Sequence, residues 1–559
     1  MPDLLLRIDE LSISFDLPNT KDDFLAVDGI SFQFHQGEVL GIVGESGSGK
    51  SLTALSIMGL LPDQAQLEVK GIHFGQTQTS LHQLSPKAYE KIRGNDIGMI
   101  FQEPMSSLNP VFKCGFQIEE TLTNNLKLSK KDAILIAKEW LQKVGITDIE
   151  RVYTSYPHQL SGGQKQRVMI AIAMCCNPKL LIADEPTTAL DVTIQKKVLD
   201  LLIQLKEETG TSILFISHDL AVIREIADRV LVMQKGKIVE VAEVNQIFSK
   251  PQHPYTRGLI ACRPQLGKSY HRLPTLTDFL NNTPKNDEQG SIIKPKSSAQ
   301  TLKLLQLDKI SVHYKEQALL WKSKATTKAV DQVSLSIHEG ETLGLVGESG
   351  CGKSSIAKAI AQLTPVTSGN ILYKGKAFHE IAKKSYYQQV QMIFQDPNSA
   401  LNPRIPAGEA ILEPLYLNHR GPRTQLREKV YELLNLVGLD QSSYSKYPHQ
   451  FSGGQKQRLC IARALVVEPD LLICDEVVSA LDVSVQAQIL NLLKDIQSDK
   501  GLSILFISHD LSVVEFMSDR IAVMRTGKIQ EIGKASEIYQ NPQSEYTRQL
   551  IAAIPGQSF

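Results

Sequence analysis

The stretch GESGSGKS at residues 44–51 decides the fold, and a second copy, GESGCGKS, stands at residues 347–354. Both match G-x-x-x-x-G-K-[ST], in which backbone N–H groups cradle phosphates, the lysine reaches the β and γ oxygens, and the hydroxyl binds Mg²⁺. The chain is therefore expected to hold two nucleotide-binding units. Their candidate binding residues are Gly44, Ser46, Gly47, Gly49, Lys50 and Ser51 in the first copy and Gly347, Ser349, Gly350, Gly352, Lys353 and Ser354 in the second.

The residues around each copy provide the setting that this motif needs. Residues 39–43 and 342–346 are short apolar runs, typical of buried parallel strands, and apolar residues recur at helical spacing after each lysine. Each loop is therefore predicted to lead into a helix N-terminus, where unpaired N–H groups and the helix dipole favour a phosphate anion. A glycine-rich turn without a ligand would not explain two copies in the same setting.

Composition limits the class of protein. The chain has 559 residues, more than one core normally holds, and its 60 Lys and Arg balance 60 Asp and Glu, so no nucleic-acid partner is expected. No apolar run reaches the roughly 18 to 20 residues that span a bilayer, and the first ten residues lack a signal-peptide pattern, so a cytosolic chain is expected. The 7 cysteines include no C-x-x-C pair, which argues against a zinc site or a disulfide framework.

The two halves of the chain are related by an internal repeat. The second copies of Ser161, Asp184 and His218 all lie the same number of residues downstream, whereas the phosphate loops are somewhat further apart. A duplicated domain with length differences before Ser161 explains this pattern. We predict a first domain at residues 1–262, a linker at 263–302 and a second domain at 303–559. The linker is rich in Pro, Asn, Lys and Ser and is expected to be mobile over residues 281–298.

Strand and helix patterns alternate within each half. The first half opens with an apolar-rich strand ending near Phe15 and an expected antiparallel partner, followed by the strand of the phosphate loop. Later apolar runs at 180–183 and 213–216 are separated by helical stretches. This order indicates an α/β protein with a parallel core.

An apolar run ending in two acids follows each phosphate loop. The aspartate, Asp184 or Asp475, is expected to hold Mg²⁺, and the next residue, Glu185 or Glu476, to polarise the attacking water. Such a strand end alone is a weak signal, because ordinary buried strands also end in surface acids. Its recurrence after both phosphate loops makes the functional interpretation the better one.

The sequence SGGQKQR occurs at Ser161 and again at Ser452. Its glycines permit close approach of the backbone to a ligand, and its serine presents a helix N-terminus. With these motifs the chain resembles ABC-type ATPases that have two nucleotide-binding domains fused in one polypeptide. The resemblance implies two tandem P-loop NTPase domains, each with a RecA-like parallel-sheet core, an antiparallel β subdomain and a helical signature subdomain.

The same resemblance implies two composite ATP sites. In that family the signature serine and glycines of one domain close over the γ-phosphate held by the other. One site would pair Lys50 with Ser452, Gly453 and Gly454, and the other would pair Lys353 with Ser161, Gly162 and Gly163.

Further polar residues take their expected roles from the family. Gln102 and Gln395 match the glutamine that senses Mg²⁺ and the membrane partner. His218 and His509 match the histidine that contacts the γ-phosphate, and the SHDL context in both halves outweighs the ordinary expectation of a core histidine.

The remaining family positions concern communication and the base. Asp191 and Asp482 match the loop that communicates between the sites. Phe15 and Tyr314 are candidates to stack on adenine, although aromatics on edge strands serve packing about as often. Both sites are expected to be complete.

One departure between the halves carries a hypothesis. Cys351 stands where the first half has Ser48, and it places a thiol in the second phosphate loop. Alkylation of this thiol is expected to inhibit the second site.

The branch is narrowed by FQEPMSSLNP and FQDPNSALNP, by YPHQ before each signature, and by the HPYTR and SEYTR endings of the halves. These resemble the dipeptide, oligopeptide, nickel and glutathione branch of bacterial importers. The resemblance implies an ATP- and Mg²⁺-dependent subunit at the inner face of the cell membrane, with two transmembrane permease subunits and an extracytoplasmic solute-binding protein as partners. The cargo stays open among peptides, glutathione, metal chelates and other small solutes.

Two other functions fit the sequence less well. A soluble ABC ATPase acting on ribosomes or nucleic acid would usually carry a long charged helical linker or inserted zinc sites, and this sequence has neither pattern. A generic P-loop kinase leaves SGGQ unexplained.

Overall fold

The computed structural model describes residues 3–16, 23–75, 80–102, 107–187, 191–268, 270–281, 302–315, 326–417 and 421–554. The segment expected to be mobile, 281–298, lies outside these residues except for Asn281. Within the described ranges, no helix is long and apolar enough to cross a membrane.

Each half contains a six-stranded sheet with the same strand order. All neighbours pair in parallel except the strand at one edge, which is antiparallel. The first sheet runs β10 (Lys237–Glu243), β9 (Arg229–Gln234), β3 (Val39–Val43), β8 (Ser212–Ser217), β7 (Leu180–Asp184), β6 (Ile97–Ile100). The second runs β20 (Lys528–Lys534), β19 (Arg520–Arg525), β13 (Thr342–Val346), β18 (Ser503–Ile507), β17 (Leu471–Asp475), β16 (Val390–Ile393).

This strand order places the site. Strands β3, β8 and β7 are parallel neighbours, so their carboxyl ends meet at one edge of the sheet. The residues that directly follow them are the phosphate loop, His218 and Glu185. The central strands are buried along their length, which explains why they read as continuous apolar runs.

A smaller antiparallel sheet accompanies each parallel sheet. In the first half it contains β1 (Leu4–Phe15), β2 (Phe24–His35), β4 (Ala65–Glu68) and β5 (Gly71–Phe74). In the second half it contains β11 (Lys303–Lys315), β12 (Thr326–His338), β14 (Ser368–Tyr373) and β15 (Lys376–Ala377). The buried side chains of β1 share one core with those of β3, and the second half repeats this packing.

Helices complete each half. The helix after the phosphate loop is α1 (Lys50–Met58) in the first half and α13 (Lys353–Ile360) in the second. We call His218 and His509 the switch histidines. They are followed by α9 (Leu220–Ile226) and α20 (Leu511–Met517). The helical subdomains contain α4 (Cys114–Leu126), α5 (Lys130–Lys143), α6 (Ile149–Thr154) and α7 (Gly162–Met174), and α16 (Ala407–Leu417), α17 (Arg423–Leu436) and α18 (Gly453–Leu465). The predicted α/β fold, with its antiparallel and helical parts, is confirmed.

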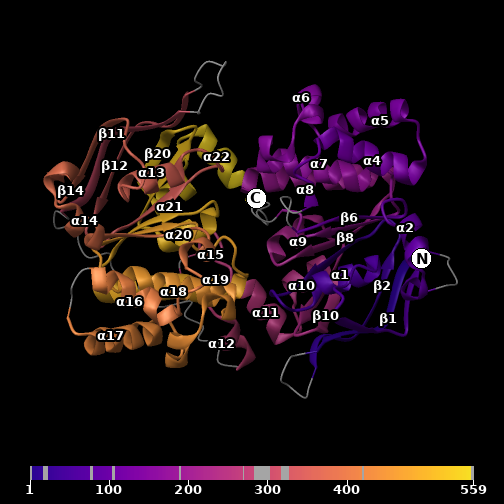
Figure 1. Ribbon diagram of the computed structural model, residues 1–559, viewed down its shortest axis with the longest axis horizontal. Helices are drawn as coiled ribbons and strands as arrows, with labels where there is room; N and C mark the ends of the chain where they lie inside the picture. Colours follow the sequence, from indigo (N-terminus) through magenta and orange to yellow (C-terminus); the bar gives the residue numbers. More distant parts are fainter. Residues whose placement is uncertain are drawn as a thin grey trace.

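The halves lie side by side and point in opposite directions (Figure 1). The helical subdomain of the first half lies at the same end of the molecule as the antiparallel sheet of the second, and the reverse holds at the other end. Helices α8 (Val192–Thr209) and α22 (Glu545–Ala552) meet across the boundary, where Lys196 Nζ donates to the Ala552 carbonyl at 3.3 Å.

Part of the predicted linker has a defined structure. It follows α11 (Pro254–Ala261) and includes the short helix α12 (Leu276–Leu280), which the sequence did not predict because five residues show no periodicity. Leu273 exchanges two backbone-to-side-chain hydrogen bonds with Asn491, each 2.8 Å long. The stretch before residue 281 therefore docks on the second half, and the domain boundaries themselves stay a prediction.

Candidate nucleotide-binding sites

Glycines give each phosphate loop its shape. Gly49 has a φ of 99° and Gly352 a φ of 110°, a left-handed backbone that L side chains rarely adopt. A Cβ on Gly352 would lie 2.1 Å from the carbonyl oxygen of Ala329 in β12. The loop backbone therefore packs directly on the antiparallel sheet, which sets where the following helix begins.

The predicted lysines lie within their own loops. Lys50 Nζ donates to the carbonyl oxygens of Gly44 at 2.8 Å and Glu45 at 2.9 Å, and Lys353 makes the matching bonds at 2.7 and 3.0 Å. Burial lowers the pKa of Lys50, and the Glu185 carboxylate is the largest opposing influence. The ammonium group is therefore held where phosphate oxygens would approach it.

Each loop hydroxyl meets the predicted Mg²⁺ aspartate. Ser51 Oγ donates to Asp184 Oδ1 at 3.0 Å, and Ser354 Oγ donates to Asp475 Oδ1 at the same distance. Burial raises the pKa of Asp184 to about 6, partly opposed by the hydrogen bond from Ser51. Hydroxyl and carboxylate oxygens beside a phosphate loop fit Mg²⁺, which is usually held by one or two carboxylates plus substrate phosphates.

Glutamine and histidine converge on the glutamate of the first half. Gln102 Nε2 donates to Glu185 Oε2 at 3.2 Å, and His218 Nδ1 lies 3.0 Å from the same oxygen. Burial lowers the pKa of His218, but the contact with Glu185 raises it by more, so the net pKa is above its ordinary value. The carboxylate therefore stabilises the charged form of the imidazole.

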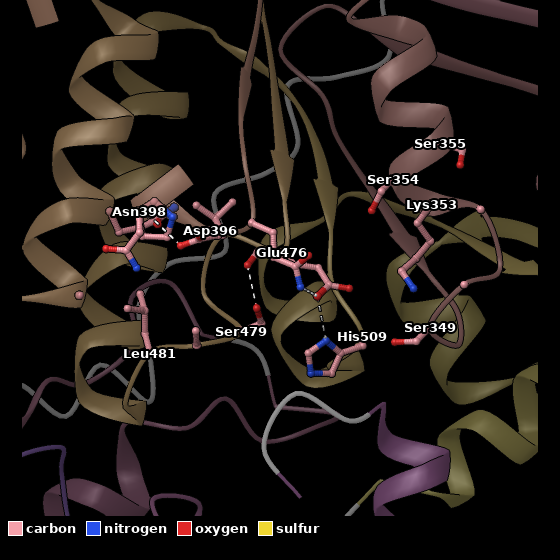
Figure 2. Close-up of a pocket in the computed structure, with 18 residues that line it drawn as sticks. Ser349, Lys353, Ser354, Ser355, Asp396, Asn398, Glu476, Ser479, Leu481 and His509 are labelled. Atoms are coloured by element: carbon pink, nitrogen blue, oxygen red, sulfur yellow. Dashed lines mark hydrogen bonds and ion pairs between the residues drawn. The ribbon is translucent and has the colours of Figure 1, made fainter. Parts of the chain in front are cut away.

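The second half repeats the trio with different distances, and Figure 2 shows Glu476 beside His509. Gln395 Nε2 donates to Glu476 Oε2 at 2.7 Å, whereas His509 Nδ1 is 3.7 Å from that oxygen. Burial raises the pKa of Glu476, but His509 lowers it more, so the net pKa is below its ordinary value. Such a carboxylate stays ionised and can accept a proton.

Both glutamates have a left-handed backbone. The φ angle is 47° at Glu185 and 50° at Glu476, and each N–H donates at 3.0 Å to a carbonyl of the neighbouring strand, that of Ile216 or Ile507. Such a conformation costs roughly 1 to 3 kcal/mol and persists only where its surroundings hold it. The turn after β7 and β17 therefore aims the carboxylate at the edge where the phosphate loop lies.

Each signature motif starts a helix. Ser161 Oγ accepts from Gln164 N at 3.3 Å while Gln164 Oε1 accepts from Ser161 N at 3.2 Å, and Ser452 and Gln455 form the same capping box. Gly162 is exposed and a Cβ there would meet nothing within 4 Å. The helix N-terminus therefore stays open to an anion.

A cavity of about 620 Å³ adjoins the second phosphate loop (Figure 2). Its lining over the described residues comes from the second half alone and includes Lys353, Gln395, Gly453 and Glu476. Ser161 is not among these residues. The pairing of each lysine with the signature of the other half therefore stays a prediction.

The two halves do exchange contacts at the phosphate loops. Ser46 donates from both N and Oγ to Asp482 Oδ1, each at 2.9 Å. Ser349 N donates to Asp191 Oδ2 at 3.4 Å. Each loop thus receives a carboxylate from the opposite half, which is the head-to-tail arrangement that composite sites require.

The candidate adenine-stacking residues differ in position. Tyr314 is 42% exposed, and its hydroxyl donates to Ser355 Oγ at 3.3 Å, a residue that lines the cavity. Phe15 is partly buried and packs against the core of the first half. Tyr314 is therefore the more exposed of the two candidates.

Two tyrosines that contact the phosphate loops were not predicted. The hydroxyl of buried Tyr255 accepts from Glu45 N at 3.0 Å, and that of Tyr546 accepts from Glu348 N at 3.2 Å. They are the tyrosines of the HPYTR and SEYTR endings, whose repetition was the available signal. These residues hold the phosphate loops from the C-terminal end of each half.

The buried position of Cys351 argues against the expected alkylation of its thiol. Its side chain is buried, and burial raises the pKa of the thiol although Lys353 opposes this. A buried thiol with a raised pKa is a poor nucleophile.

Two phosphate loops, each with a carboxylate pair and a histidine, define a nucleotide-hydrolysing enzyme of the P-loop class. The chain belongs to the ABC transporter family, which it matches over residues 27–188 and 330–479. A second match, to the C-terminal region of oligopeptide/dipeptide transporters, covers residues 239–290 and 530–557. The predicted class, an ATP-hydrolysing protein with two fused ABC domains, is confirmed.

Related proteins align along nearly the whole chain. The glutathione import ATP-binding protein GsiA of Pectobacterium atrosepticum is 42% identical over 564 residues, covering 99% of this chain and 89% of the relative. GsiA of Escherichia coli strain K12 is 44% identical with the same coverage. These matches confirm the predicted importer branch, and the alternative of an ATPase acting on ribosomes or nucleic acid is not favoured.

Proposed function

We propose that the chain powers the import of glutathione or another small peptide through a membrane permease. The observation that carries this proposal is the presence, in both halves, of a glutamine, a glutamate and a histidine beside a phosphate loop that contacts the opposite half. The cargo is inferred from relatives that are named for glutathione import and from the oligopeptide/dipeptide C-terminal region.

In this proposal the chain works as an ATP-driven clamp. ATP binds at Lys50 and Lys353, and the signature helices α18 and α7 then close on the phosphate held by the opposite half. Glu185 and Glu476 take a proton from the attacking water while the switch histidines orient them. Hydrolysis releases the halves, and this movement drives the permease.

We also propose that Ser51 and Asp184, with Gln102, hold Mg²⁺ in the first site, and that Ser354 and Asp475, with Gln395, hold it in the second. Bound Mg²⁺ supplies charge neutralisation for the phosphates. Mn²⁺ paramagnetic resonance in the presence of ADP tests this without relying on turnover. The Asp184→Ala, Asp475→Ala double variant is expected to lose the bound-Mn²⁺ signal, and retention of that signal would contradict the assignment.

The proposed partners are two transmembrane permease subunits and an extracytoplasmic solute-binding protein, with the chain on the inner face of the membrane. The tagged chain, purified from gently solubilised membranes, is expected to bring two polytopic proteins with it, identified by mass spectrometry. Ribosomal proteins or nucleic acid in their place would overturn the importer function.

Cargo is tested with the co-purified complex in liposomes. ATP-dependent accumulation of labelled glutathione or glycylglycine is expected once the solute-binding protein is supplied. The complex carrying Glu185→Gln and Glu476→Gln is the matched control and should accumulate neither. Equal accumulation with this control would show that ATP hydrolysis by this chain does not drive uptake.

A further inference from the structure

One arginine, Arg263, contacts both halves of the protein at the aspartates that follow the switch histidines. Arg263 Nη1 lies 2.5 Å from Asp219 Oδ1, and its Nη2 lies 3.5 Å from Asp510 Oδ2. The two aspartates directly follow His218 and His509. Arg263 thus connects equivalent positions of the two domains through a single side chain.

The second half has no equivalent arginine at this place. The repeated endings HPYTRGLIACR and SEYTRQLIAAI align Arg263 with Ile554. Ile554 is 4% exposed and lines the same interdomain cavity, which has a volume of about 100 Å³. The bridge therefore breaks the symmetry of the repeat and cannot be doubled by a second guanidinium.

Both aspartates also control the start of a helix. Asp219 Oδ1 accepts from Ala221 N at 2.8 Å at the beginning of α9, and Asp510 Oδ1 accepts from Ser512 N at 2.9 Å at the beginning of α20. Each histidine is the residue before its aspartate. A shift of either aspartate therefore moves the backbone that carries its switch histidine.

The chemistry of the bridge favours a shared response. A guanidinium presents several donors in a planar fork, so it can hold two carboxylates at once. Burial raises the pKa of Asp510, but Arg263 is the largest of the influences that bring it below its ordinary value. Loss of one contact would leave a partly buried carboxylate without its guanidinium partner, which is costly.

We propose that Arg263 is a positioning residue that couples the two switch histidines, so that hydrolysis at one ATP site depends on the state of the other. The ion pairs of Arg263 are with Asp219 and Asp510 rather than with a phosphate loop or a candidate catalytic glutamate, so it acts through these two aspartates. The inference rests on the proposed role of both sites in hydrolysis.

The test disables one site at a time, with and without the arginine. Steady-state ATPase rates are measured for Glu185→Gln and for Glu476→Gln, each alone and combined with Arg263→Met. With Arg263 present, the loss of one site alone would halve the parent ATPase rate. We expect each single-site variant to be at least about fivefold slower than that, because fivefold is the lower end of typical coupling. With Arg263→Met, each is expected to keep about half of the rate of the Arg263→Met protein.

Arg272→Met is the matched control, because Arg272 lies in the same segment and pairs with Asp495 of the second half alone, at 2.9 Å. It should leave the coupling unchanged. An equal loss of coupling in Arg272→Met would show that Arg263 merely anchors the segment, and would overturn the proposal.

Asp510→Asn removes the same ion pair from its other side, so the test does not depend on whether Arg263→Met folds. An amide oxygen still caps α20, whereas the charge pair across the halves is removed. Asp510→Asn is expected to lose coupling as Arg263→Met does. Unchanged coupling in both variants, or half-rate single-site variants in the presence of Arg263, would overturn the proposal, whereas absence of any ATP hydrolysis would instead count against the proposed function.

Discussion

The two candidate ATP sites contain the same glutamine, glutamate and histidine but hold them differently. In the first site the glutamate is 3.0 Å from histidine and 3.2 Å from glutamine, whereas in the second these distances are 3.7 and 2.7 Å. The glutamate thus leans towards its histidine in one site and towards its glutamine in the other. Identical motifs therefore do not impose identical geometry, because the surrounding half of the protein also positions them.

The contacts between the halves are unequal for a local reason. Asp482 gives one oxygen to two hydrogen bonds from Ser46, and it makes no side-chain cap of α19 (Val483–Lys500). Asp191 instead caps α8 by accepting from Ile194 N at 2.9 Å, and its other oxygen reaches Ser349 N only at 3.4 Å. The first phosphate loop is therefore held more firmly by the opposite half.

The largest expected effect tests what the two sites share. Glu185→Gln with Glu476→Gln should lower turnover by about 10²- to 10⁴-fold, because each site loses its positioned base. Phosphate release at saturating ATP measures this, with retained ATP binding as the control for folding. Near-normal hydrolysis in the double variant would remove both glutamates from the mechanism.

A smaller effect tests the unequal contacts. Asp482→Asn should destabilise the nucleotide-free protein by about 1 to 2 kcal/mol, since two charge-assisted hydrogen bonds become neutral ones. Asp191→Asn should cost less than about 1 kcal/mol, because its cap survives and its cross-half bond is long. Thermal unfolding compares the two variants. Equal destabilisation would mean that the two loops are held alike.

The tyrosines behind the loops offer a milder perturbation. Tyr255→Phe removes the acceptor of Glu45 N–H, which should cost about 1 kcal/mol, or about fivefold in ATP affinity at the first site. Tyr546→Phe should act in the same way on the second site. Equilibrium binding of a fluorescent ATP analogue measures the change in affinity that each tyrosine variant causes. Glu476→Gln or Glu185→Gln is present in these proteins to slow turnover. Unchanged affinity in a folded Tyr255→Phe protein would show that the hydroxyl does not hold the loop.

The smallest expected effect concerns the thiol that distinguishes the second loop. Cys351→Ser should change turnover less than about twofold, because the first half works with Ser48 at this position. Maleimide labelling of Cys351 should be slow in the folded protein and fast in urea, as followed by peptide mass spectrometry. Rapid labelling of the folded protein, with loss of activity, would restore the alkylation hypothesis.

Most of the site could be read from the sequence because nucleotide motifs are local. The phosphate loop, the acidic strand end and the signature each occupy a few consecutive residues, and parallel strands carry them to one edge. Tyr255 and Arg263 lie far along the chain from the groups that they contact, and neither belongs to a motif with a chemical signature. The helix α12 was missed because docking on the second half, rather than apolar periodicity, stabilises it.

The sequence by itself determined the class of protein and the duplicated fold, and it predicted the candidate catalytic residues, since backbone chemistry and apolar periodicity act over short stretches. Only the tertiary structure decided that Asp482 and Asp191 cross to the opposite loops, that each glutamate leans to a different neighbour, and that Arg263 pairs with Asp219 and Asp510 of the two halves. These features depend on how two similar halves face one another. A buried charge between the halves is costly unless it is paired, and which group pairs with it depends on position in space rather than on position in the chain.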